Sequence, residues 1–325
     1  MKSVVMMQFK TIKGFSLTEL MIAMLLGLLV LGGVLGVFFA NQTTSRVNAS
    51  LSELQNTARI AFQLMSKDIR NAGFNGCGNP VQVTNVLNVA PAQPWATWNQ
   101  GIRGFSSPLA AINGLTPAAN TEAIRLMYAA GNSNSVQVHD AASAQFTVTT
   151  TPVVRALDIA MVCDDTLTAI FQVSAVNAVA NTIEHTTAGA PLNGTQNFRF
   201  ANPFVFATAA IRTFPSTAMI MRFESVAWFV APSSDDTSVK SLYRAALIGP
   251  NQVNEEVLFG VSNLQLRYMD GTTRQFSTAN AVIDWGDIIA VSVTLTLDGA
   301  VLKDLNVSAD VKSLNFLVTL RNRVG

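Results

Sequence analysis

The residues best placed for chemistry lie near the start of the chain, where one glycine and one carboxylate border a long apolar segment. Lys10 and Lys13 precede Gly14, a small residue at which a peptidase could cut. Residues 20–40 then form an uncharged run of 21 residues, about the length of a membrane-spanning helix. A carboxylate beside the hydrocarbon region is costly, so we expect Glu19 to have a partner and a purpose.

The position of Gly14 argues against an ordinary secretory signal. Such a signal has an apolar run of about 7–15 residues, and its small-residue cleavage site follows the run. Here Gly14 precedes a longer run, so a cut after it would leave the helix on the mature chain. A signal anchor that is never cut is the alternative. Lys2, Lys10 and Lys13 lie before the run and Arg46 is the first charge after it, which predicts a cytoplasmic leader and an external domain.

The stretch Gly14-Phe15-Ser16-Leu17-Thr18-Glu19-Leu20, with lysines just upstream, strongly resembles the processing site of type IV prepilins and type II secretion pseudopilins. In that family the prepilin peptidase cuts after the glycine, and the new N-terminal residue is N-methylated. The resemblance implies cleavage between Gly14 and Phe15, methylation of Phe15, and a role for Glu19 in subunit assembly.

Physical chemistry offers a use for this glutamate. After the cut, the ammonium group of Phe15 would lie four residues from Glu19 on one helix face. Packed subunits could pair Glu19 of one with the Phe15 amine of its neighbour, and stranding either charge would cost about 3–5 kcal/mol. We therefore expect the pair to fix the register of adjacent subunits. A glutamate that only reaches the headgroups is the alternative.

Beyond the membrane segment, apolar residues continue at steps of four and three, as on one face of an amphipathic helix. These residues are Val47, Leu51, Leu54, Ala58, Ala61, Met65 and Ile69. Gly73 is a suitable stop, so we predict one helix over residues 15 to about 71. The expected segments are a leader (1–14), an N-terminal helix (15–72, with 20–40 transmembrane) and a globular periplasmic domain (73–325). Major pilins often carry a proline in this helix, and its absence here favours a minor subunit.

The remainder of the chain contains short runs with β-type composition, at 124–128, 146–150, 157–162, 169–175, 219–230, 261–268, 288–297 and 314–320. Polar and apolar residues alternate in the last three, which predicts an antiparallel sheet with one exposed face. Residues 81–121 contain four prolines and are expected to be rich in loops. We predict an α+β, pilin-like fold in which the long helix packs on a mainly antiparallel β-sheet domain.

The two cysteines, Cys77 and Cys163, both belong to the part of the chain expected outside the membrane. A cysteine pair in an oxidising compartment indicates a disulfide. Free or catalytic thiols are the alternative, but neither cysteine has a nearby CxxC partner.

The chain offers little material for an enzyme. His139 and His185 are its only histidines, and neither lies at metal-ligand spacing from another ligand. No GxSxG, HExxH or P-loop motif occurs. The pairs Asp164-Asp165 and Asp235-Asp236 could hold calcium, although such pairs are commonly solvated turns. We expect no catalysis, cofactor or metal, and no nucleic-acid partner, because no basic patch is interleaved with aromatic residues.

Later phrases resemble the PilW group of minor pilins. They are residues 68–74 (Asp-Ile-Arg-Asn-Ala-Gly-Phe) with Gly76-Cys77, Cys163-Asp164 followed by Ala169-Ile170-Phe171, residues 261–268 (Val-Ser-Asn-Leu-Gln-Leu-Arg-Tyr), and Leu320-Arg321-Asn322-Arg323. This resemblance implies a minor pilin for the assembly or initiation of type IV pili, and so for twitching motility. Its partners would be other minor and major pilins, the prepilin peptidase and the inner-membrane assembly platform. It would be held in the inner membrane and enter the pilus (fimbrium) after assembly.

Two alternatives remain open at this point. A minor pseudopilin of a type II secretion system shares the helix and much of the C-terminal phrase. A pilus-tip adhesin would use the loops at 81–121 and 177–198 as a binding surface.

Overall fold

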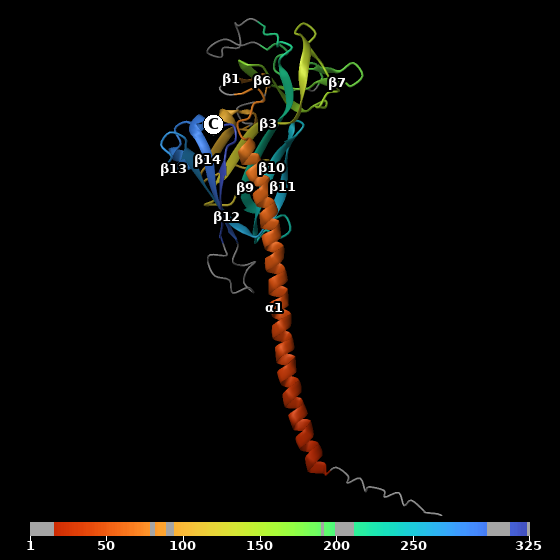
Figure 1. The fold of residues 1–325 in the computed structure, drawn as a ribbon, viewed down its shortest axis with the longest axis vertical. Coiled ribbons are helices and arrows are strands. Elements are labelled where there is room, and N and C mark those ends of the chain that lie inside the picture. The colour runs from red at the N-terminus through yellow and green to blue at the C-terminus, as the bar shows by residue number, and fades with distance from the viewer. Residues whose placement is uncertain are drawn as a thin grey trace, which may run out of the picture. The chain divides into compact units, whose positions relative to one another are not determined.

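The computed structural model describes residues 16–78, 82–88, 94–189, 192–198, 211–297 and 313–323. The chain divides into two compact units, Met1–Gln55 and Asn56–Gly325. One helix, α1 (Leu17–Asn71), contributes to both units and has 55 residues. Figure 1 shows the helix and the strands with their labels.

In the first unit, α1 is an apolar helix whose described side chains are all exposed. The 30-residue segment Leu17–Arg46 is long and apolar enough to cross a membrane. Contiguous apolar surface of this size is not stable in water, so lipid or other apolar helices must cover it.

The second unit contains two β-sheets. In its described residues the larger sheet has eleven strands: β1 (Gln82–Asn85), β2 (Ile102–Phe105), β3 (Ala123–Asp140), β4 (Gln145–Val148), β5 (Ile159–Cys163), β6 (Leu167–Gln172), β7 (Ala175–Asn177), β8 (Thr182–Glu184), β9 (Met219–Pro232), β10 (Lys240–Ile248) and β11 (Asn251–Phe259). The smaller sheet has four: β12 (Val261–Asp270), β13 (Phe276–Ser277), β14 (Ile288–Leu297) and β15 (Ser313–Thr319). Short 3-10 turns are η1 (Pro94–Ala96), η2 (Asn99–Gly101), η3 (Ala279–Ala281) and η4 (Trp285–Asp287).

The larger sheet runs in the order β1-β6-β5-β9-β3-β4-β8-β7, with β10 paired to both β9 and β11, and β2 paired to β3. Its pairs are antiparallel except β1 with β6, which is parallel. The smaller sheet is antiparallel throughout, in the order β13-β12-β14-β15. The expected α+β architecture, a long N-terminal apolar helix followed by mainly antiparallel sheet, is therefore confirmed.

The last turns of α1 lie against the larger sheet, as Figure 1 shows beside β9 and β10. Ala58, Ala61, Met65 and Ile69 are buried, so the predicted apolar face is the packed face over this stretch. The side chains of Val47, Leu51 and Leu54, which complete the predicted pattern, lie outside the described ones.

The strands in which buried and more exposed residues alternate clearly are those that the sequence predicted best. β14 buries every second residue over much of its length, including Val291, Val293, Leu295 and Leu297. The predicted loop-rich region 81–121 contains only the short strands β1 and β2 and two 3-10 turns in its described part. The hairpin of β10 and β11 was not foreseen.

Candidate functional site

Gly14 and Phe15, the predicted cleavage and methylation residues, lie outside the described residues, which begin at Ser16. Directly after them, Ser16 and Glu19 cap the N-terminus of α1. The Ser16 backbone N–H donates to Glu19 Oε2 at 3.1 Å, and the Glu19 N–H donates to Ser16 Oγ at 3.2 Å. This reciprocal pair is a capping box, which satisfies backbone donors that have no acceptor within the helix.

The capping box gives Glu19 a local role that the sequence prediction did not consider, although its Ser-x-x-Glu spacing was visible. Glu19 Oε2 is used by the cap, while the side chain as a whole is exposed. The carboxylate is therefore accessible to a cationic partner as well. Its pairing with a neighbouring Phe15 amine stays a prediction.

Near the other end of α1, Cys77 Sγ is bonded to Cys163 Sγ with an S–S distance of 2.02 Å and a Cα–Cα distance of 5.8 Å. Cys163 is the last residue of β5, so the bond joins the segment after the helix to the larger sheet. Gly76 allows this approach, because a Cβ there would lie 3.0 Å from Cys163 Sγ and 2.8 Å from Met221 Sδ. Its φ of +96° also favours glycine.

One turn before the helix ends, the buried carboxylate of Asp68 joins α1 to three strands of the larger sheet. Asp68 is 2% exposed. It accepts hydrogen bonds from Tyr128 Oη at 2.7 Å, Trp228 Nε1 at 3.0 Å and Arg244 Nε at 2.9 Å. These partners come from β3, β9 and β10 and share one face of the sheet, since Arg244 is in register with Trp228. The carboxylate thus has both a counter-charge and hydrogen-bond donors, as a buried ion requires.

The charges of this cluster stabilise one another. Burial, together with the neighbouring Asp68 carboxylate, raises the pKa of Tyr128, so the phenol stays a donor. Burial acts to lower the pKa of Arg244, but the hydrogen bonds and charge of Asp68 outweigh it and the pKa is raised. The cluster has no open coordination or nucleophilic group, and its arrangement is that of a structural anchor.

The C-terminal phrase packs at the same end of α1. The Arg321 backbone N–H donates to the Arg70 carbonyl at 3.0 Å. The Arg323 guanidinium donates to the carbonyls of Ile288 (3.1 Å), Trp285 and Gln100. The Arg70 carbonyl, which has no acceptor role within the helix at its C-terminus, is thereby satisfied by a residue from a distant part of the chain.

The turn after the helix is held to β3. The Gly73 N–H donates to the Met127 carbonyl at 2.8 Å, and the Ala129 N–H donates to the Phe74 carbonyl at 2.7 Å. Gly73 and Phe74 therefore extend the pairing along β3 beyond Ile102, the first residue of β2. Gly73 has φ +79°, the left-handed conformation common directly after helices.

The structure brings together the two histidines that the sequence separates. His139 Nε2 and His185 Nε2 are 3.2 Å apart, among the rings of Phe146, Phe171, Phe198 and Phe214. Burial lowers the pKa of His139 to about 4, and burial together with His139 lowers the pKa of His185 to about 3. Both rings are therefore neutral near pH 7.

The hydrogen bonds assign the tautomers of this pair. The Phe214 N–H donates to His139 Nδ1 at 3.0 Å, so His139 carries its proton on Nε2 and donates to His185 Nε2. The described residues contain no group of three or more side chains suited to a metal.

One aspartate of each acidic pair considered for calcium is bound by the chain itself. Asp164 Oδ1 accepts from Thr166 and Leu167, and its other oxygen pairs with Arg212. Asp236 Oδ1 accepts from the N–H and hydroxyl of Ser238. Both aspartates close turns, as such residues commonly do.

The N-terminal segment of the chain matches one known family model. Residues 9–35 match the family described as the prokaryotic N-terminal methylation motif. This motif places the chain in the type IV pilin and pseudopilin superfamily, whose members are processed by the prepilin peptidase and are structural proteins rather than enzymes. Together with the apolar helix, this motif indicates a prepilin anchored in the inner membrane. A search of curated proteins found no match to the chain.

Proposed function

We propose that this protein is a minor pilin of the PilW group that takes part in assembling or initiating type IV pili. The observation that carries the proposal is the first unit, an exposed apolar helix whose first turn contains one carboxylate, Glu19. In this proposal, the apolar side chains of this helix contact other pilin helices and the lipid of the inner membrane. In this proposal the peptidase cuts after Gly14, and Phe15 becomes the methylated N-terminus.

The contacts in the second unit support the finer assignment. Three of the phrases that resemble the PilW group meet around the end of α1. Asp68 and Arg70 belong to the first phrase, Cys163 to the second and Arg321 to the last. Arg321 bonds the Arg70 carbonyl, and Cys163 is bonded to Cys77 just beyond the helix. Residues that look unrelated along the chain thus build one junction, which gives the similarity of separate phrases a common structural cause.

The experiment that tests the function is deletion of the gene followed by complementation with the full chain. We expect the deletion strain to lose surface pili and twitching, and the wild-type chain to restore both. A matched complementation with Glu19→Val should restore protein level but not pili, because the helix could no longer pair with its neighbour. Pili can be counted by electron microscopy and sheared-fraction immunoblots.

Other outcomes would assign the alternatives. Retained pili with loss of protein secretion would identify a type II secretion pseudopilin. Retained pili that no longer attach to surfaces would identify a tip adhesin, and deletion of the loop within 106–120 should then reproduce that defect. Either result would overturn the proposed role in assembly.

A further inference from the structure

A pocket of about 600 Å³ lies within the second unit. Its floor includes Ala123 and Arg125 of β3, and its walls include Trp95, Phe105 and Ile112. Ala123 and Arg125 alternate along β3 with Ile124, which is in register with Trp228. Since Trp228 contacts Asp68 of α1, the pocket is on the sheet face opposite to the helix. This volume is within the range of about 300–1,000 Å³ typical of small-molecule sites.

The unusual member of the pocket is Arg125. The residue is only 4% exposed, and its Nε and Nη1 have no hydrogen-bond partner in the described part of the chain. The described ion pairs do not include it. A buried guanidinium without a counter-charge destabilises the fold, so its retention calls for a reason. Burial accordingly lowers the pKa of Arg125 to about 10.

The cross-strand neighbours of Arg125 on β9 and β10 offer it no counter-charge. Arg125 is in register with Ala227 of β9, which is in register with Ala245 of β10. These methyl side chains are on the same face as Arg125 and are too short to cover it.

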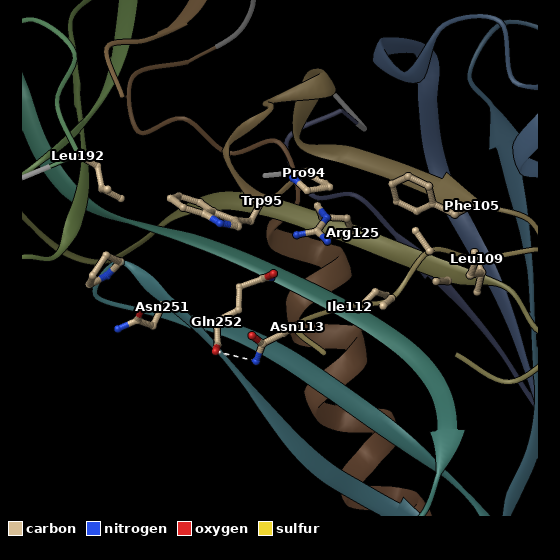
Figure 2. Close-up of a pocket in the computed structure, with 14 residues that line it drawn as sticks. Pro94, Trp95, Phe105, Leu109, Ile112, Asn113, Arg125, Leu192, Asn251 and Gln252 are labelled. Carbon is tan, nitrogen blue, oxygen red and sulfur yellow. Dashed lines mark hydrogen bonds between the residues drawn. The ribbon is translucent and has the colours of Figure 1, made fainter. Parts of the chain in front are cut away.

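A second polar side chain, that of Gln252, lines the same pocket. Gln252 Nε2 is buried and also has no hydrogen-bond partner among the described residues. Asn113 holds the backbone at that position, because its Nδ2 donates to the Gln252 carbonyl at 2.8 Å. Figure 2 shows the ends of the Arg125 and Gln252 side chains directed toward one another in the pocket. The described residues that line it include no aspartate or glutamate.

We propose that this pocket binds a small organic monocarboxylate with an apolar body. A guanidinium offers several N–H donors in a planar array that matches a carboxylate. One buried cation suits a single negative charge, whereas a phosphate dianion would require more positive charge than the lining provides. The aromatic and aliphatic walls would take up the apolar body, as in most small-molecule sites.

The test uses the full chain in lipid nanodiscs, with benzoate as the probe and benzamide as its uncharged counterpart. Isothermal titration calorimetry should show saturable benzoate binding and at least about tenfold weaker benzamide binding, as expected when a charged hydrogen bond is lost. Inorganic phosphate should not displace benzoate. Equal binding of benzoate and benzamide, displacement by phosphate, or no binding of benzoate would overturn the proposal.

Variants locate the site. Arg125→Gln should weaken benzoate binding by about tenfold or more. Arg103→Gln is the matched control, because Arg103 is the cross-strand neighbour of Arg125 but is exposed and lies over the Trp285 ring. It should leave the affinity within about twofold. Unchanged benzoate affinity in Arg125→Gln, or an equal loss in both variants, would contradict the assignment.

Folding of the Arg125 variant gives an independent readout. If the guanidinium is retained for binding, Arg125→Gln should melt at the same or a higher temperature than the wild type without probe, because it removes an unpaired buried charge. Benzoate should raise the melting temperature of the wild type but not of the variant. A variant that melts well below the wild type would show that Arg125 is structural and would overturn the proposal.

Discussion

The Arg244 guanidinium donates from Nε to Asp68 Oδ2 at 2.9 Å, across 176 residues of sequence. This buried ion pair fixes the last turn of α1 on the larger sheet. Tyr128 and Trp228 complete the shell of donors around the carboxylate. The pair is therefore the point at which the helix and the β-rich domain depend on each other most directly.

Replacing Asp68 should destabilise the domain severely. Asp68→Leu leaves Arg244 buried without its counter-charge, and we expect the free energy of unfolding to fall by about 3–5 kcal/mol. The double variant Asp68→Leu with Arg244→Met should recover part of that loss. Arg222→Gln is the control. The Arg222 side chain is half exposed in its ion pair with Glu224, so this pair should contribute less than about 1 kcal/mol to the free energy of unfolding. Chemical denaturation measures all four chains, and equal effects of Asp68→Leu and Arg222→Gln would refute the anchor.

Loss of the Cys77–Cys163 disulfide should lower the periplasmic yield. The two residues are 86 apart in sequence, for which the chain-entropy relation gives about 4–5 kcal/mol of stabilisation. Cys77→Ser, Cys163→Ser and the double variant should lose similar stability, because each removes the same bond. Dithiothreitol should destabilise the wild type but not the double variant. Detection of a free thiol at Cys163 in native protein would contradict this prediction.

The histidine pair predicts a specific acid sensitivity. An unfolded histidine has a pKa near 6.5, whereas burial lowers the pKa of His139 to about 4 and of His185 to about 3. Between about pH 4 and 6.5 the unfolded chain binds more protons, so the free energy of unfolding decreases as the pH falls.

Melting curves between pH 7 and 4.5 should show this decrease, and His185→Gln should make it shallower. The pKa values of the Asp164 and Glu256 carboxylates are lowered in the folded chain, so their contribution to the free energy of unfolding is lost mainly at lower pH. A wild-type melting temperature that stays constant from pH 7 to 4.5 would rule out the effect.

Processing is tested by the mass of the mature chain. We expect the chain isolated from the membrane to begin at a methylated Phe15, because the segment matched by the methylation motif contains Gly14 and Phe15. Gly14→Val should accumulate as the unprocessed precursor. Finding the wild-type chain with Met1 intact would show that it is an uncleaved anchor.

Substitutions at Glu19 separate its two possible uses. Glutamine can occupy the third position of a capping box, so Glu19→Gln keeps the cap but removes the charge. If Glu19 pairs with a neighbouring amine, Glu19→Gln and Glu19→Val should both be cleaved yet enter pili poorly. Ser16→Ala is the control, since it weakens the cap by about 0.5–2 kcal/mol and leaves the carboxylate. Normal incorporation of Glu19→Gln, measured by immunoblots of sheared pili, would assign the residue to capping alone.

Local sequence patterns predicted the elements in which buried and exposed residues recur with a regular period. The long helix and the strands β12, β14 and β15 follow from periodicity, because one face of each packs on a core. β11 was missed because most of its residues are polar or partly exposed, as suits an edge strand. The Gly249-Pro250 turn between β10 and β11 was the available signal.

The candidate sites also differ in how far the sequence could predict them, because some are formed by nearby residues and others by residues far apart in the chain. The Ser16–Glu19 box is a contact across three residues and was legible in the sequence. The bonds of Asp68 span 60, 160 and 176 residues, and the histidine pair spans 46, so only the sheet register brings those side chains together. The Arg125 pocket is likewise lined by residues as far apart in sequence as Pro94 and Gln252, which no spacing along the chain reveals.

The hydrogen bond from the Arg321 N–H to the Arg70 carbonyl, at the end of α1, bears on the order in which the domain is completed. A chain that is exported from its N-terminus delivers Asn71 long before residues 321–323, and Arg323 bonds a carbonyl 223 residues upstream. The Arg70 carbonyl at the end of the helix therefore lacks the hydrogen bond from Arg321 until that residue has been made. The junction at the end of α1 is thus closed by a residue that follows β15, among the last of the described residues to be synthesised.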